Sequence, residues 1–212
     1  MYIPSLFSET DIKVIQNDIR NWGFATLITF SNEKVETPHI SHVPLLLIDD
    51  EDSPNGIIHG HLAKANPHST ALEGNSSSIA IFHGPHAYIS PQWYGARYAV
   101  PTWNYLTVHA YGVTSIYDES HLVKKQLDLM VEQYESKITP QWSTSTLTDE
   151  EMSGLMKGIV CFKMPISSYQ AKSKLGQNRK PDQIQGMYDG LIEEGSPNSL
   201  SLADIIKQRV IK

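Results

Sequence analysis

The chain has 212 residues, of which 40% are hydrophobic and 19% charged, and its formal net charge is −6 at pH 7. This composition supports a sizeable core and excludes global disorder. The acidic balance argues against a protein whose main task is to coat nucleic acid, because phosphate contacts need Lys and Arg.

Cysteine content and the lack of long apolar runs bear on location. Cys161 is the only cysteine, which excludes an intramolecular disulfide and a cysteine-based zinc site. The first residues show no secretory signal, and no apolar run approaches the roughly 18 residues that span a bilayer. We therefore expect a cytoplasmic protein with no membrane partner.

Apolar periodicity, capping pairs and turn residues predict the elements in chain order. Ser8 with Asp11, and Thr148 with Glu151, resemble capping boxes at helix starts. The expected helices are 9–21, 66–74, 118–134, 148–157, 181–195 and 201–212. The expected strands are 24–30, 35–48, 57–63, 78–84, 87–90, 102–117 and 158–164. Segment 49–56 is expected to be a solvated acidic turn, and 135–148 a loop.

The strands follow one another without long crossover helices, and most helices lie at the ends. This order predicts an α+β fold with an antiparallel, barrel-like sheet. Alternation in 102–117 places Tyr105, Thr107 and His109 on one face and Leu106 and Val108 on the other.

Eight of the nine histidines cluster between residues 39 and 109. A metal or haem site is one interpretation, and hydrogen bonds to an anion or to backbone carbonyls are another. The metal interpretation is weakened because H-E-x-x-H is absent and no acidic residue accompanies the histidines of the central strands. We predict no metal ligand.

The segment HGHLAKANPH (59–68) runs from a strand through a turn into a short helix. Lys64, His61 and Asn66 could seat a phosphate there, together with free N–H groups of the helix. The alternative is an ordinary surface lysine beside an ordinary Asn-Pro turn, since no glycine-rich phosphate motif is present.

The stretch 89–105 contains five aromatic residues: Trp93, Tyr94, Tyr98, Trp103 and Tyr105. Amphipathic rings on a loop fixed by prolines suit a planar ligand or a subunit interface. Ordinary core packing is the alternative, although a core would use more Leu, Ile and Val. Arg97 is the only charge in this stretch.

A basic cluster, Lys172, Lys174, Arg179 and Lys180, lies in 170–183. It suits an anion site or a DNA contact, and a solvated loop is the alternative. No Ser-His-Asp or paired-carboxylate arrangement can be singled out and G-x-S-x-G is absent, so we predict no catalytic residue.

Five stretches in this order resemble the PaiB family of FMN-binding split-barrel proteins: MYIPSLF, HGHLAKANPH, FHGPHAYISPQWY, VPTWNYLTVHAYG and KLGQNRK. The resemblance covers nearly the whole chain. It implies a six-stranded antiparallel split β-barrel with flanking and C-terminal helices, usually a homodimer with FMN at its interface. Members are described as negative transcriptional regulators (repressors) of sporulation and protease genes.

Carried onto this chain, the resemblance implies phosphate contacts from His61, Lys64 and Asn66. The aromatic segment would supply the flavin walls and neighbouring polar contacts: Tyr88, Ser90, Trp93, Tyr94, Trp103, Asn104 and Tyr105. Gln177, Asn178 and Arg179 match the KLSQN-type pattern of the family, whereas Gly176 replaces its serine.

The expected organisation is an FMN-binding split-barrel domain, 1–165, followed by a C-terminal basic loop and helices, 166–212. The expected function is an FMN-binding repressor. Two alternatives remain open, namely a flavin-dependent oxidoreductase or flavin reductase, and a haem-handling split-barrel protein.

Overall fold

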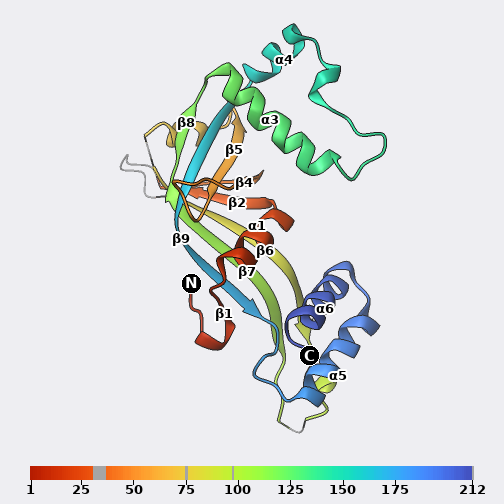
Figure 1. Cartoon of the computed structure of the whole chain (residues 1–212). Helices are drawn as coiled ribbons and strands as arrows, with labels where there is room; N and C mark the ends of the chain where they lie inside the picture. Colours follow the sequence, from red (N-terminus) through yellow and green to blue (C-terminus); the bar gives the residue numbers. More distant parts are fainter. Residues whose placement is uncertain (31–36, 75, 97, 212) are drawn as a thin grey trace. The chain divides into compact units, whose positions relative to one another are not determined.

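The computed structural model describes residues 1–30, 37–74, 76–96 and 98–211 (Figure 1). Their contacts form two compact units. Unit 1 comprises Met1–Asp18, Phe82–His109 and Gln170–Lys212, and unit 2 comprises Ile19–Ile81 and Ala110–Tyr169. The predicted division after residue 165 stays a prediction, and it falls inside strand β9 (Ile159–Lys174).

The strands are hydrogen-bonded in the order β3-β2-β6-β7-β9-β5-β4, and β1 and β8 also pair with β9. Six strands have six or more residues: β2 (Phe24–Thr29), β3 (His39–Pro44), β5 (Ile57–Ala63), β6 (Ser77–Ile89), β7 (Thr102–Val113) and β9. The other three have two or three: β1 (Ser8–Glu9), β4 (Leu46–Ile48) and β8 (Ser115–Tyr117). The antiparallel α+β class is confirmed, whereas the described sheet has nine strands where the resemblance implied six, the three short strands being additional.

Unit 2 contains the β2–β3 hairpin and the β4–β5–β9–β8 pairing. In β5 alternate residues are buried, so Ile58, Gly60 and Leu62 face the core while His59 and His61 face outward. A Cβ at Gly60 would lie 2.7 Å from the Phe162 ring, so any larger residue at this core position would force neighbouring side chains to move. The helices are α2 (His68–Leu72), α3 (Ser120–Glu135) and α4 (Asp149–Met156), with a 3₁₀ turn η3 (Thr144–Thr146).

Unit 1 contains the C-terminal part of β6, the N-terminal part of β7, and the end of β9 paired with β1. Two helices follow β9: α5 (Pro181–Glu194) and α6 (Pro197–Arg209). Its 3₁₀ turns are η1 (Ser5–Phe7) and η2 (Pro91–Tyr94). Helix α1 (Ile12–Asn21) begins in unit 1 and ends in unit 2. The fully buried core side chains of this unit include Phe82, Ile89, Leu175 and Met187.

Several predicted boundaries are wrong for identifiable reasons. The first helix begins at Ile12, because the Asp11 carboxylate accepts from the N–H of Lys13 while Ser8 is in β1. The last helix begins four residues earlier than predicted, at Pro197, since Ser196 caps it. Strand 102–117 divides at Thr114, whose N–H and hydroxyl both donate to the carbonyl of Ser76.

Two further strand predictions need correction. Strand 35–48 divides at Leu45 into β3 and β4, and residues 35–36 lie outside the described residues. Segments 78–84 and 87–90 join into the single strand β6, because Pro85 has a φ that extended backbone accepts. Strand 158–164 continues to Lys174.

The capping box at Thr148 and Glu151 is confirmed, with both reciprocal hydrogen bonds present. Within the described part of the chain, no helix combines the length and the hydropathy that crossing a bilayer requires.

Candidate functional site

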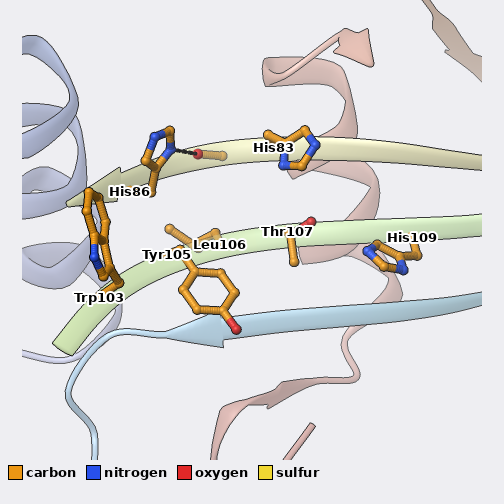
Figure 2. A pocket seen from close by; sticks show the side chains of 8 residues that line it. His83, His86, Trp103, Tyr105, Leu106, Thr107 and His109 are labelled. Carbon is orange, nitrogen blue, oxygen red and sulfur yellow. Dashed lines mark hydrogen bonds between the residues drawn. The ribbon is translucent and has the colours of Figure 1, made fainter. Parts of the chain in front are cut away.

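Unit 1 carries a hollow on the exposed face of β6 and β7, with a volume of about 400 Å³ (Figure 2). We call it the Trp103 face. Its main side chains are His83, His86, Trp103, Tyr105, Thr107 and His109. Figure 2 shows that they come from two neighbouring strands, with Trp103 beside His86 at one end and His109 at the other.

A shift in β6 brings His86 to this face. Phe82 and Gly84 are buried and His83 is exposed, yet beyond Pro85 the pattern moves by one residue, so His86 and Tyr88 are exposed. Such a shift is what a β-bulge produces. The Gly-Pro pair that suggested a break between strands therefore sets which side chains the face presents.

The rings of the Trp103 face are arranged around one exposed indole. Trp103 is 54% exposed, its ring centroid lies 6.1 Å from that of His86, and the Tyr88 ring meets it edge-on at 6.3 Å. The Nδ1–H of His86 donates to the carbonyl of Gly84 over 3.3 Å, so Nε2 is the ring nitrogen left for another partner. Burial lowers the pKa of His109, so its imidazole is neutral at pH 7.

Three other predicted residues of the aromatic segment pack inward. Asn104 is 1% exposed, and its amide donates to the sulfur of Met187 at 3.1 Å. The buried Tyr94 lies under the Arg179 guanidinium, 4.2 Å from the ring centroid, and burial raises the pKa of Tyr94. The Trp93 ring lies against Gly190 of α5. The core-packing interpretation therefore holds for Trp93 and Tyr94, and the ligand or interface interpretation stays a prediction for the exposed ring of Trp103.

Ser90 and Gln177 have local structural contacts. The Ser90 hydroxyl caps η2 by accepting from the N–H of Gln92. Gln177 donates to the carbonyl of Ser173 at 2.6 Å and accepts from the N–H of Leu175. Asn178 is exposed, and Arg97 lies outside the described residues.

Gly176 has a φ of +85°, a conformation that favours glycine over serine. This conformation explains why glycine suits the KLGQN turn of this chain.

The basic cluster is largely used inside unit 1. Lys172 is 8% exposed, and its ammonium donates to the carbonyl of Tyr2 and lies 5.1 Å from the Tyr105 ring centroid. Lys174 donates to Thr102 and to the carbonyl of Trp103. Of the four cations predicted to contact DNA, Lys180 is the exposed one.

In unit 2, Lys64 is exposed and Asn66 builds the turn before α2. The Asn66 side chain accepts from the N–H of His68 and donates to the Ser41 hydroxyl, which also bonds His68 Nδ1 at 2.8 Å. The ring of His39 stacks on that of His68 at 5.6 Å. Burial, assisted by His39, lowers the pKa of His68 to about 4.

His61 lies elsewhere in unit 2, where it lines a cavity of about 430 Å³ that we call the Trp142 cavity. Its other main side chains are Pro44, Met130, Val131, Tyr134 and Trp142. His61 Nδ1 is buried and has no hydrogen-bond partner among the residues that the structure describes. Of the residues that line this cavity, the sequence singled out His61, and it gave no signal for Trp142.

No group of three or more His, Cys, Asp or Glu side chains that could hold a metal occurs among the described residues. The strand order, the long antiparallel strands and the ring-lined hollow define a protein of the split-barrel class. A family model described as "Putative FMN-binding domain" matches residues 1–168. The chain belongs to this family, and within it to the PaiB family.

Individual proteins are similar to this chain in sequence and in fold. The chain is 34% identical over 212 residues to the "Protease synthase and sporulation protein PAI 2" of Bacillus subtilis (strain 168), covering 100% of this chain and 99% of that protein. The FAD and heme binding protein of Mycobacterium smegmatis has a similar fold, with a TM-score of 0.59 and 12% identity over 79% of this chain and 73% of that one. The conserved hypothetical protein Rv2991 of Mycobacterium tuberculosis has a TM-score of 0.60 and 12% identity over 85% and 94% of the two chains.

Proposed function

We propose that this protein binds FMN, that the isoalloxazine ring lies on the Trp103 face, and that the complex acts as a regulator. One observation carries the location: Trp103 and Tyr88 are 54% and 46% exposed beside a hollow that other rings line. Large exposed aromatic side chains that gather around a hollow are typical of ligand or subunit contacts rather than of plain surface.

The side chains of the Trp103 face fit a flavin. The indole of Trp103 offers a flat apolar surface of the kind on which a planar ring stacks. His86 and His109 carry imidazoles that can exchange hydrogen bonds with the polar edge of the ring. The Thr107 hydroxyl already donates to the carbonyl of Phe82, so it could only accept a hydrogen bond from the flavin. When bound, a flavin supplies electron or hydride transfer, and the protein positions and tunes it.

The Trp103 face is in unit 1 and Lys64 is in unit 2, so the phosphate contact that the resemblance implies for Lys64 is a separate proposal with a test of its own. The Lys64 ammonium is exposed, and its backbone N–H is held by the carbonyl of Gly158 at 2.8 Å. A fixed backbone under a free ammonium suits an anion contact. Asn66 and His61 are weaker candidates than Lys64 for a phosphate contact, because the Asn66 side chain bonds to Ser41 and His61 lines the Trp142 cavity.

The test is FMN titration of the full chain, followed by quenching of flavin fluorescence, with two tryptophan variants. Trp103 and Trp142 are 54% and 43% exposed and line different cavities, so they form a matched pair. We expect Trp103→Ala to weaken FMN binding at least tenfold and Trp142→Ala to change it less than threefold. The reverse result would move the flavin to the Trp142 cavity, and no binding by the unaltered chain would refute the proposal.

We also propose a homodimer, which the resemblance implies and the exposed rings Tyr88 and Trp103 support. Light scattering after gel filtration measures the mass directly, against 23.8 kDa for one chain. A monomer at micromolar concentration, with and without FMN, would contradict it.

The regulatory part of the proposal is supported by the name of the Bacillus subtilis relative. If DNA is contacted directly, the exposed Lys180 is the basic-cluster residue that can reach it, since Lys172 and Lys174 have internal partners. A mobility shift on DNA upstream of protease genes should weaken for Lys180→Glu and persist for the control Lys207→Glu. FMN-dependent oxidation of a nicotinamide cofactor, without any shift, would favour the oxidoreductase alternative.

A further inference from the structure

Unit 2 contains a third cavity, of about 580 Å³, between the outward face of its sheet and α3. We call it the His59 cavity. Its volume falls within the range of about 300–1,000 Å³ that is usual for small-molecule sites. It is separate from the Trp142 cavity, because the two are lined by different faces of α3: Leu122, Lys125, Gln126 and Leu129 here, and Leu127, Met130, Val131 and Tyr134 there.

The sheet supplies a polar floor. His59 pairs across strands with Lys163, and Lys163 pairs with Ser115 of β8, so these three side chains form one row on one face. In the next row of β8, the Tyr117 hydroxyl lies 3.1 Å from His59 Nδ1.

A partly buried hydrogen-bond chain fixes the tautomer of His59. The single proton of the Tyr117 hydroxyl is donated to Gln126 Oε1, and the Gln126 amide donates to the sulfur of Met130. Tyr117 must therefore accept from His59 Nδ1–H, which leaves His59 Nε2 as an acceptor. Burial, followed by Lys163 and Lys125, lowers the pKa of His59 to about 4, so the imidazole is neutral at pH 7.

Two lysines line the cavity, Lys125 on α3 and Lys163 on β9 in the row of His59. Within the described ranges neither side chain has a hydrogen bond or an ion pair. Asp50 and Glu119 also line the cavity. The two lysines and two carboxylates balance in number, but at the His59 imidazole the positive charges of Lys163 and Lys125 each outweigh the negative charge of Asp50.

Apolar side chains form the remaining walls, chiefly Ile48, Ile57, Ile116, Leu122 and Leu129. We propose that the His59 cavity binds a small amphipathic organic anion, whose carboxylate lies between Lys125 and Lys163 and whose apolar body covers the isoleucine and leucine walls. A donor group on such a ligand would meet His59 Nε2. The site does not depend on the flavin proposal, since none of its residues belongs to the proposed FMN contacts.

The test is calorimetric titration of the full chain with octanoate and with octan-1-ol, each with and without excess FMN. The double variant Lys125→Gln/Lys163→Gln removes the two cations. The control is Lys124→Gln/Lys157→Gln, because Lys124 is the neighbouring helix residue and pairs with Asp128 instead, and Lys157 is an exposed lysine after α4. All four positions are lysines that can be exchanged without opening the core.

We expect octanoate to bind, the double variant to bind it at least tenfold more weakly, and the control to remain within twofold. Octan-1-ol should bind at least tenfold more weakly than octanoate. Absence of octanoate binding, equal binding by the double variant, or equal affinity for the alcohol would overturn the proposal. Displacement of octanoate by FMN would also overturn it, because the ligand would then share the flavin site.

Discussion

The indole ring of Trp93 packs directly on the Cα of Gly190. A Cβ at this position of α5 would lie 2.3 Å from Trp93 Cδ2, closer than atoms can approach. One turn earlier, a Cβ at Gly186 would lie 2.2 Å from the carbonyl oxygen of Trp93. Two glycines on one face of α5 thus let the helix pack against the 3₁₀ turn η2, with Cγ, Cδ2 and Cε2 of the Trp93 ring next to Gly190.

Gly190→Ala should destabilise the protein although alanine favours helix. Overpacking a tight contact costs about 1–3 kcal/mol, against a gain of at most about 1 kcal/mol in helix propensity. The control is Gly154→Ala in α4, where no atom lies within 4 Å of the added Cβ, so we expect no loss of stability. Urea denaturation of both variants measures the difference, and equal midpoints would refute the packing role of Gly190.

Arg209→Ala should cost far more stability than Arg20→Ala. Arg209 makes two hydrogen bonds, of 3.0 and 2.5 Å, to the buried carboxylate of Asp18, whereas the Arg20–Asp49 pair is exposed. Burial raises the pKa of Asp18 despite Arg209, so an unpaired carboxylate there would be costly. Breaking a buried pair costs about 3–5 kcal/mol, and breaking an exposed pair costs about 1 kcal/mol or less. The midpoints of thermal or urea unfolding rank the two variants.

Stability should fall as the pH decreases from about 6.5 to 4. The pKa values of His59 and His68 are lowered to about 4, so the unfolded chain binds more protons than the folded one in this window. The stabilising contribution is complete above pH 6.5 and is lost as the pH approaches 4, by on the order of a few kcal/mol. Urea midpoints across this range measure the slope. His68→Gln should flatten it, and an unchanged slope would contradict the assignment.

Lys64→Ala should weaken binding of FMN but not of riboflavin, which lacks the phosphate. Loss of one charged hydrogen bond costs about 1.5–3 kcal/mol, or roughly 10- to 150-fold in affinity. Lys157→Ala is the control, since it removes a lysine that is also exposed in unit 2. Equal loss for both flavins would show that Lys64 acts on the fold or the ring instead.

Gly176→Ser, which introduces the serine that the resemblance implies for this position, should destabilise this chain. A non-glycine residue at positive φ costs about 1–2 kcal/mol, and the Cβ would also lie 2.9 Å from the Met187 methyl group. The size of the loss in urea denaturation checks this, and a neutral result would mean that the turn adapts. Gly95→Ser provides a comparison at positive φ without a nearby side chain.

Local signals predicted the elements whose cause is local. The capping box at Thr148 and the apolar alternation of β5 act within a few residues, so sequence alone located α4 and β5. The path of β6 through Gly84-Pro85 could not be predicted this way, because neighbouring strand contacts decide whether a Gly-Pro pair ends a strand or shifts its register.

For the candidate site as well, local features could be predicted and contacts with distant parts of the chain could not. Its residue types were visible in the sequence, and seven residues of the aromatic segment were expected to contact the flavin together. Their separation into the exposed Trp103 and the inward Trp93, Tyr94 and Asn104 depends on α5, which lies some eighty residues further along the chain. The Lys172 contacts depend likewise on Tyr2, at the other end of the sequence, so its loss from the solvent-exposed basic cluster had no local signal.

The boundary between the two units crosses the chain after Asp18, Ile81, His109 and Tyr169, inside α1, β6, β7 and β9. Neither unit is therefore one uninterrupted stretch of polypeptide, and every deletion that isolates one would cut through a strand. Truncation mapping cannot assign flavin or anion binding to either half. Flavin or anion binding has to be assigned by single side-chain exchanges in the intact chain, or with circular permutants that keep β6, β7 and β9 whole.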